Sequence, residues 1–324
     1  KKELQQSIEK HETELIKTSD AIWEAAETAL LEFKSSKILI DHAKRNGFDV
    51  EEGVAGIKTA FTASYGSGRP IIGILGEFDA NAGISQKRKP VKEARIPGGA
   101  GHGCGHNLFG TASLGAAIAI KEQIEKGNIK GTVIFYGTPA EETIFAKVWM
   151  VREGLFDKLD VCMDWHPGDV IEAGTQSSKA LVDFRVKFRG SSAHASSDPW
   201  NGKSAADAME LYTTGLNYYR EHIEPTARIH YQIEKAGDVV NVVPDYAQIW
   251  TRLRQNDRAG VDVLYERALD IAKGAALMTG TTYETKLISG IYEIQVNRTG
   301  AAILQKNLET LGEITYTDSE LNYA

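Results

Sequence analysis

Apolar residues in the first half of the chain follow helical spacing in some segments and form short continuous runs in others. Residues 3–31 and 35–46 show helical spacing, and Gly47 marks the end of the second predicted helix. The apolar runs within RPIIGILGEFDA, GTVIFYGTPAEE and DVCMDWHPGD predict buried strands. Residues 108–124 predict a helix whose alanines and glycines allow close packing. This alternation of strands and helices predicts an α/β domain.

The pattern changes after Ser178, where strictly alternating strands replace the buried runs. KALVDFRVKFRG begins a series of strands and helices in the order β-α-β-β-α-β, the ferredoxin-like unit. Such a unit supplies its own core, so we expect an inserted domain at 179–290. A helix at 297–312 is expected to return to the first domain, which then comprises 1–178 and 291–324.

Composition narrows the class of protein. The 324 residues are 42% hydrophobic and 25% charged, as in an ordinary globular protein with two domains. A net charge of -7 argues against a nucleic-acid partner, and the lack of a run of about 20 apolar residues argues against a membrane span. Two cysteines, Cys104 and Cys162, favour a cytoplasmic location. We expect Cys162 to be buried in its strand, and His11 and His42 to lie on helix surfaces.

The segment HGCGH, residues 102–106, places two histidines and a cysteine within five positions. Glycines on both sides of Cys104 allow side chains to crowd around one point. A thiolate and a neutral imidazole are good ligands for zinc or a neighbouring transition metal. The same residues also fit a buried free cysteine beside a histidine that caps a helix, and the motif alone does not decide between the two interpretations.

Other polar residues follow the ends of the predicted strands. Asp79 follows one strand, the Glu141-Glu142 pair a second, and His166 a third. In open α/β sheets, the carboxyl ends of the strands form the crevice in which ligands bind. Adjacent residues of an extended segment point in opposite directions, so one carboxylate could bind metal while the other faces a substrate as a base. A solvated loop or an ordinary strand end explains each residue singly, but together with HGCGH they favour a metal site.

The motifs HGCGHN, GTPAEE, DWHPGD, GSSAHAS and NVVPD resemble, in this order, the metal-dependent amidohydrolase family of carboxypeptidase G, the aminoacylases and the auxin-conjugate hydrolases. HGCGHNLFGT and ILGEFDA are similar to its p-aminobenzoyl-glutamate hydrolase branch. The resemblance implies a zinc-peptidase-like catalytic α/β domain with an inserted ferredoxin-like domain that pairs two copies of the chain into a homodimer. It also implies a small-molecule amide as substrate.

The resemblance assigns roles to individual residues. The implied ligands of one or two divalent transition metal ions per chain, zinc or manganese, are Cys104, His106, Glu142 and His166. Glu141 would be the general base, and Asp79 would orient a metal-binding group. His194 would reach the substrate carbonyl, Asn241 would contact the substrate, and Arg252 would grip a substrate carboxylate. The implied reaction is cleavage of an N-acyl amino acid, an aminobenzoyl-glutamate-like conjugate or a dipeptide by metal-activated water.

Two features depart from the family pattern. The last histidine is His230, whereas the family has a further metal-binding histidine near its C-terminus, so either this sequence omits the end of the catalytic domain or the protein lacks it. NAGIS follows GEFDA where relatives usually have a Leu-Pro pair. A catalytically impaired relative that acts as a binding or assembly subunit is therefore an alternative. A nucleophilic Cys104–His106 pair is a second, but it leaves the other strand ends unexplained. The role of His102 stays open.

Overall fold

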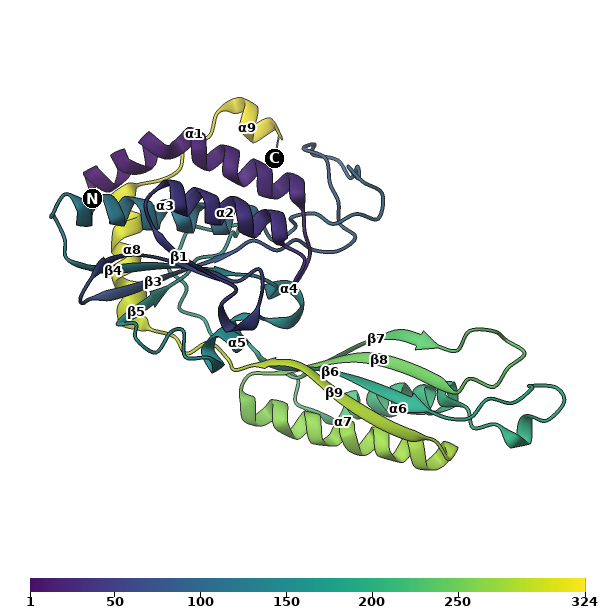
Figure 1. Ribbon diagram of the computed structural model, residues 1–324. Helices are drawn as coiled ribbons and strands as arrows, with labels where there is room; N and C mark the ends of the chain where they lie inside the picture. Colours follow the sequence, from purple (N-terminus) through teal and green to yellow (C-terminus); the bar gives the residue numbers. More distant parts are fainter. Residues whose placement is uncertain (324) are drawn as a thin grey trace. The chain divides into compact units, whose positions relative to one another are not determined.

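The computed structural model describes residues 1–323 and divides the chain into two compact units (Figure 1). The first comprises Lys1–Glu172 and the segment that begins at Leu308, and the second comprises Ala173–Asn307. Each unit combines a β-sheet with helices, which confirms the α/β class. The catalytic and dimerisation roles expected of residues 1–178 with 291–324 and of residues 179–290 stay predictions. Within residues 1–323, no helix has the length and apolarity that crossing a membrane requires.

A five-stranded sheet in the order β1-β2-β4-β3-β5 forms the centre of the first unit. Its strands are β1 (Asp49–Glu52), β2 (Phe61–Ser67), β3 (Ile71–Glu77), β4 (Gly131–Thr138) and β5 (Val161–Met163). β3 runs parallel to β4 and β5, with Glu77 opposite Thr138, whereas β2 is antiparallel to β1 and β4. The carboxyl ends of three strands therefore share one edge of the sheet.

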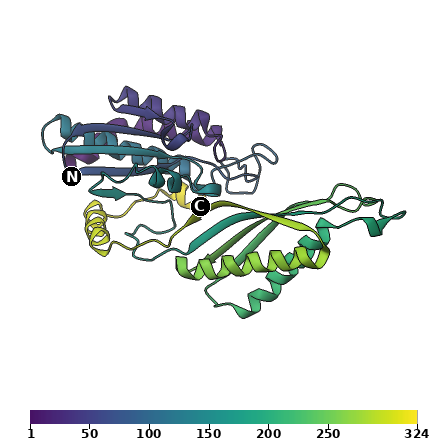
Figure 2. The same cartoon turned by 60° about the horizontal axis from the view of Figure 1, so that its bottom comes forward.

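Three helices, α1 (Lys2–Ala25), α2 (Phe33–Arg45) and α3 (His106–Glu125), lie together on one face of this sheet (Figures 1 and 2). Their apolar faces form one core with the strands, in which Ile22 and Leu114 are fully buried. Burying each aliphatic side chain of this size contributes about 2 kcal/mol. The shorter helices are α4 (Glu141–Ile144), α5 (Lys147–Arg152), α8 (Arg298–Leu311) and α9 (Asp318–Tyr323).

α3 packs closely against the end of β3 because the face it buries carries small residues. A Cβ added to Gly110 would lie 2.6 Å from the carbonyl oxygen of Glu77, far inside the ordinary contact distance of about 3.5 Å. Only glycine fits at this point. The close contact holds the N-terminus of α3, which begins at His106, at the carboxyl edge of the sheet.

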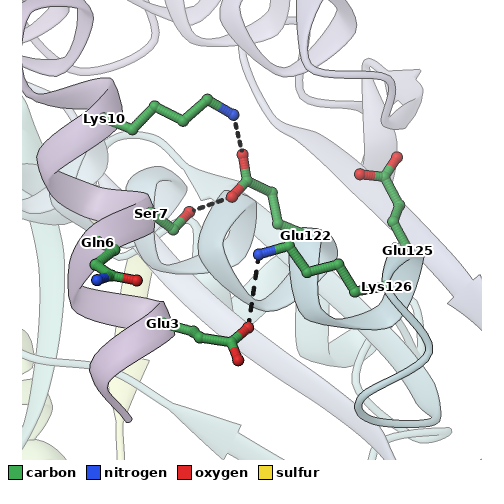
Figure 3. A pocket seen from close by; sticks show the side chains of 7 residues that line it. All are labelled: Glu3, Gln6, Ser7, Lys10, Glu122, Glu125 and Lys126. Carbon is green, nitrogen blue, oxygen red and sulfur yellow. Dashed lines mark hydrogen bonds and ion pairs between the residues drawn. The ribbon is translucent and has the colours of Figure 1, made fainter.

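Glu122, near the C-terminal end of α3, ties this helix to α1 (Figure 3). Its carboxylate accepts hydrogen bonds from Ser7 at 2.7 Å and Lys10 at 2.8 Å, and it lies 3.0 Å from His11 Nε2. Residues of both helices line a groove of 310 Å³ around it. Burial raises the pKa of Glu122, but the hydrogen bonds from Lys10, His11 and Ser7 outweigh burial and lower the pKa to about 2. The network therefore stabilises the ionised carboxylate.

Replacing Glu122 with glutamine is expected to lower the free energy of unfolding by about 2 kcal/mol, because the amide loses the charge that the three donors surround. The pKa of the folded state lies below the ordinary value of 4.5, so this stabilisation is complete above that value and is lost as the pH falls towards about 2. Urea titrations near neutral pH and in acid measure both effects. Glu12→Gln, at an exposed position of α1, is the control. Equal losses in the two variants, or a Glu122→Gln loss that does not shrink in acid, would contradict the prediction.

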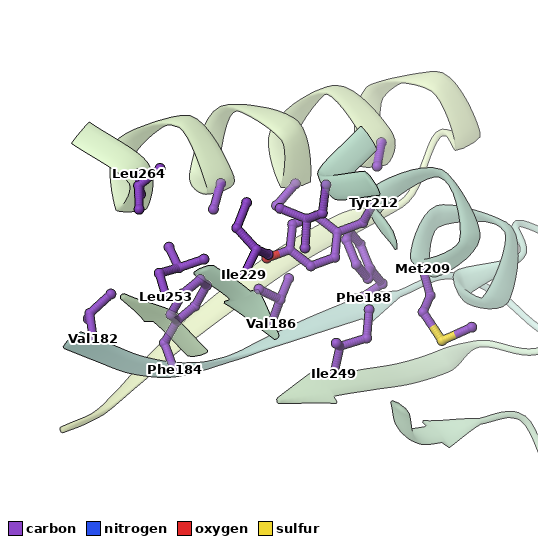
Figure 4. Close-up of a cluster of buried hydrophobic side chains, with 14 of the residues drawn as sticks. Val182, Phe184, Val186, Phe188, Met209, Tyr212, Ile229, Ile249, Leu253 and Leu264 are labelled. Carbon is purple, nitrogen blue, oxygen red and sulfur yellow. The ribbon is translucent and has the colours of Figure 1, made fainter. Parts of the chain in front are cut away.

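The second unit is built on an antiparallel sheet in the order β7-β8-β6-β9. Its elements are β6 (Ala180–Arg189), α6 (Ala205–Tyr219), β7 (Arg228–Ala236), β8 (Tyr246–Gln255), α7 (Arg258–Thr279) and β9 (Thr282–Ile291). The order along the chain confirms the β-α-β-β-α-β pattern. Figure 4 shows the core, where Phe184, Phe188 and Tyr212 are fully buried between the sheet and its helices. Alternate residues of β8 are buried, so only one face of the sheet is covered.

Three local predictions were wrong. The first helix ends at Ala25 instead of residue 31, because Ala26 adopts the left-handed backbone conformation at φ 43°. His42 is fully buried, and His11 contacts α3 through Glu122, so neither histidine is a free surface residue. Cys162 is exposed on β5, which is an edge strand and leaves this side chain uncovered.

Candidate metal centre

Side chains from three strand ends meet the N-terminus of α3 at the carboxyl edge of the first sheet. β3 ends at Glu77 and continues to Asp79, β4 leads into the Glu141-Glu142 pair, and β5 leads into the segment that carries His166. The parallel pairing of β3 with β4 and β5 explains why residues so far apart in the sequence are neighbours here.

His106, the first residue of α3, is at the centre of this cluster and is fully buried. Its Nδ1 lies 3.0 Å from Asp79 Oδ1 and 3.1 Å from the Asp79 carbonyl oxygen. Both are acceptors, so Nδ1 carries a proton and Nε2 is the atom available to a metal. Nε2 lies 3.0 Å from Glu77 Oε2 and 3.9 Å from Glu142 Oε1. Burial lowers the pKa of His106, but the surrounding carboxylates outweigh it and raise the pKa, so this site favours positive charge.

The donor set fits a divalent transition metal. Two groups of potential ligand atoms lie within 4.8 Å of one another, Cys104 with His106 and His166, and Glu77 with His106 and Glu141. In the described part of the chain, three buried atoms of the cluster lack a hydrogen-bond partner: His106 Nε2, Glu77 Oε2 and Glu142 Oε1. Buried polar atoms are rarely left without a partner, and a metal ion would satisfy all three. Thiolate, imidazole and carboxylate donors together suit zinc, manganese or cobalt.

The loop that carries Cys104 is fixed by close backbone contacts. Gly105 has φ 75°, and a Cβ there would lie 3.0 Å from Pro167 Cγ, so the segment after β5 lies directly against the start of α3. The same approach brings the rings of His106 and His166 to 5.5 Å, edge to face. Asn81, within the NAGIS segment, accepts the Gly103 N–H at 3.2 Å, and its backbone pairs with that of Gly101. The departure from the family pattern therefore supports the metal loop.

The Cys104 thiol is held in its neutral form by its surroundings. Burial, followed by the Glu142 carboxylate, raises the pKa of Cys104 to about 12. Nucleophilic cysteines have lowered pKa values and electropositive surroundings. The environment of Cys104 is therefore the opposite of what the nucleophile hypothesis requires.

The two adjacent glutamates are in different environments. Burial and then the Glu77 carboxylate raise the pKa of Glu141, which moves it towards the neutral range in which a general base operates. Glu142 is fixed through its backbone, whose N–H donates to Asp79 Oδ2 at 2.9 Å. Asp79 thus contacts both the imidazole of His106 and the segment that carries the two glutamates.

Sequence reasoning missed Glu77 and Lys147. Glu77 is only 5% exposed, and its second oxygen forms an ion pair with Lys147 at the start of α5. A glutamate at a strand end is ordinarily solvated, so its burial could not be inferred. The available signal was its position two residues before Asp79, which places both side chains on the same side of an extended segment.

The remaining candidates, His194, Asn241 and Arg252, lie in the second unit. His194 Nδ1 accepts the backbone N–H groups of Ser196 and Ser197 at 3.2 and 3.1 Å. In the neutral ring the proton is therefore on Nε2, which makes this exposed nitrogen a hydrogen-bond donor. The Asn241 carbonyl oxygen accepts the Ala195 N–H at 3.0 Å, so the structure brings His194 and Asn241 together.

Arg252 differs from these two because it is already paired. Its Nε donates to the buried Asp183 carboxylate at 2.7 Å, on the solvated face of the sheet. Arg254, two residues further along β8, is half-buried, and no hydrogen bond or ion pair of its guanidinium occurs within residues 1–323. Burial and then Arg252 lower the pKa of Arg254, as expected for a cation that lacks an anion. Sequence reasoning missed Arg254.

Comparisons with known proteins cover most of the chain. The profile of Peptidase family M20/M25/M40 matches residues 74–320. One of the subunits of p-aminobenzoyl-glutamate hydrolase from Escherichia coli (strain K12) is 41% identical over 310 residues, which are 94% of this chain and 64% of that protein. The chain therefore spans slightly less than two thirds of the length of this relative.

Solved structures share the fold at low sequence identity. An aminobenzoyl-glutamate utilization protein from Klebsiella pneumoniae has a TM-score of 0.72 at 20% identity, covering 94% of this chain and 82% of that chain. A Bacillus subtilis protein described as a dinuclear metal binding peptidase from the M20 family has a TM-score of 0.62 at 20% identity, covering 94% and 81%. These similarities confirm the fold that the sequence motifs implied.

Proposed function

The chain belongs to peptidase family M20/M25/M40, and from this premise we propose that it is a metal-dependent amidohydrolase. Its substrate would be an N-acyl amino acid, an aminobenzoyl-glutamate-like conjugate or a dipeptide. The observation that carries the proposal is the cluster of Cys104, His106 and His166, whose ligand atoms lie within 4.8 Å of one another. Beside this cluster lie Glu141, whose pKa is raised, and Glu142, whose Oε1 is buried without a hydrogen-bond partner.

The ligands in this proposal are Cys104, His106, Glu142 and His166, with zinc or manganese as the metal. One or two such ions would polarise the amide carbonyl and make a water molecule acidic enough to attack near neutral pH. Glu77 adds negative charge beside His106 Nε2, and Asp79 keeps the imidazole in the tautomer that leaves Nε2 free.

Glu141 is the general base in this mechanism. It accepts a proton from the attacking water and delivers it to the amide nitrogen as the carbon–nitrogen bond breaks, so the products are a carboxylate and an amine. Its raised pKa suits both directions of transfer, because a carboxyl group poised near neutrality both accepts and releases a proton readily.

Residues of the second unit would bind the substrate. The Nε2–H of His194 would donate to the carbonyl oxygen as negative charge develops there. Asn241 would contact the substrate beside it. Arg252, anchored by Asp183, and the unpaired guanidinium of Arg254 would bind a substrate carboxylate, such as that of a glutamate moiety.

We further propose that the chain forms a homodimer through the second unit, whose edge strands β7 and β9 each leave one side unpaired. The free thiols of Cys104 and Cys162 support a cytoplasmic location.

Metal content measured together with activity tests the proposal. The purified protein is analysed for bound metals, and hydrolysis of p-aminobenzoyl-glutamate is assayed beside a panel of acyl-amino acids and dipeptides. One or two metal ions per chain with turnover of at least one substrate would support the hydrolase. Neither metal nor turnover would favour the alternative of a binding or assembly subunit.

A further inference from the structure

Glu32 is a buried carboxylate that the proposed mechanism does not use. It is fully buried at the N-cap position of α2, and no ion pair of its side chain occurs within residues 1–323. Burying a carboxyl group without a cationic partner is unfavourable unless hydrogen bonds compensate. The position of Glu32 therefore calls for a specific partner.

The partners of Glu32 come from two distant parts of the chain. Its Oε1 accepts the backbone N–H of Ala140 at 2.9 Å, although the two residues are 108 positions apart. Its Oε2 accepts the hydroxyl of Thr59 at 3.2 Å. Its carbonyl oxygen accepts the Ser36 N–H within α2, so the helix holds the glutamate in place. Of these contacts, the one to Ala140 leads to the candidate metal centre.

Ala140 has an unusual backbone conformation. Its φ of 56° and ψ of 37° are left-handed, a region that alanine avoids because its Cβ approaches the following carbonyl oxygen. The next residues, Glu141 and Glu142, form α4, which is only four residues long and has no side-chain cap. Such a short helix does not fix its own orientation, so contacts from outside must hold the turn.

Two carboxylates supply those contacts. Glu32 accepts the N–H of Ala140, and Asp79 accepts the N–H of Glu142, so the backbone is held on both sides of Glu141. Asp79 also orients His106. The hydrogen bond from Ala140 to Glu32 therefore acts directly on the left-handed residue that precedes Glu141.

We propose that Glu32 is a positioning residue, which holds Ala140 in its left-handed conformation and thereby presents Glu141 and Glu142 to the metal centre. Burial, together with the Asp79 carboxylate, raises the pKa of Glu32 to about 7, so the two carboxyl groups influence each other. Either a carboxylate or a neutral carbonyl group at this position can accept the Ala140 N–H, and this property provides the test.

The test compares Glu32→Ala, which removes the acceptor, with Glu32→Gln, whose amide oxygen retains it. Amide hydrogen exchange at Ala140 is measured first and needs neither metal nor substrate. We expect exchange at Ala140 to be at least about 10-fold faster in Glu32→Ala and to stay within about 3-fold of the wild type in Glu32→Gln, because only the first leaves this N–H without a partner. Glu122→Gln, which loosens the same unit at the far end of α3, is the matched control and should leave Ala140 exchange unchanged.

The consequences for the site are measured with cobalt(II), whose bond to the Cys104 thiolate gives an absorption band, and with steady-state kinetics. These readouts rest on the proposed function. Glu32→Ala should lower kcat about 10- to 100-fold with a smaller change in KM, and Glu32→Gln should restore most of kcat. The cobalt spectrum of Glu32→Ala should also change.

Several results would overturn the positioning role. Unchanged Ala140 exchange in Glu32→Ala, or equal defects in the alanine and glutamine variants, would show that Glu32 does not act through this hydrogen bond. If Glu32→Ala does not fold, Glu32→Leu replaces it, because leucine fills much of the same space without an acceptor and should show the same faster exchange at Ala140. A wild-type protein that binds no cobalt and turns over no substrate would contradict the proposed function, whereas the exchange result would still decide the role of Glu32.

Discussion

Replacing Glu141 with glutamine is expected to lower kcat for amide hydrolysis about 1,000-fold while bound metal stays at the wild-type level. The amide has nearly the same shape as the carboxylate but cannot accept the proton of the attacking water. Because Glu142 and not Glu141 is the proposed ligand, the metal should remain. Steady-state kinetics and elemental analysis on the same preparations measure both quantities.

The matched control for Glu141→Gln is Glu153→Gln, at an exposed position just after α5. It removes one carboxylate from the same part of the chain and should leave kcat unchanged. Loss of metal together with activity in Glu141→Gln would assign Glu141 to the ligands. This outcome has a structural basis, because Glu141 lies within one of the two groups of potential ligand atoms.

Cys104→Ser is expected to weaken metal affinity by at least about 100-fold, a larger effect than most changes of supporting residues. A serine hydroxyl stays protonated and is a poor ligand for zinc or cobalt, whereas a bound thiolate contributes charge as well as a soft donor atom. Competition with a chromophoric chelator measures the affinity. The cobalt(II) form of the wild type should show a thiolate absorption band that Cys104→Ser lacks.

The chain contains its own control for this experiment, since Cys162 is the other cysteine and lies exposed on β5. Cys162→Ser should bind metal as tightly as the wild type and keep the cobalt band. If Cys104→Ser instead retained metal and lost all turnover, the nucleophile hypothesis would be revived in spite of the raised pKa of Cys104.

The fold was largely predictable because its elements are long and strongly patterned. Alternation in the second unit identified all of β6, β7, β8 and β9, since one face of their sheet is buried and the other is solvated. The end of the first helix was not predictable in this way. The apolar spacing continues through Ala26 and Leu30, but both have left-handed φ values, so the segment turns and leads to Glu32. Tertiary contacts there override the local pattern.

The metal centre was predictable to the extent that its residues directly follow strands. Cys104, His106 and His166 were proposed from the sequence and lie together in the structure. Glu77 and Glu32 were missed for one physical reason. A glutamate normally signals solvent, and only the packing of α3 on β3, or of the start of α2 against the Ala140 turn, shows that these two are buried.

Asp79 restricts which substitutions its position can tolerate. One of its oxygens faces His106 Nδ1 and the other faces the backbone N–H of Glu142, so both partners are donors and the side chain must accept twice. Asparagine has the same outline but only one acceptor, and its NH₂ group would face a second donor whichever way the amide turned. At this point of the chain, the replacement that is most conservative in shape is therefore not conservative in chemistry. Neutral drift from aspartate to asparagine, a single-step change in side-chain composition, is closed here by hydrogen-bond polarity rather than by volume.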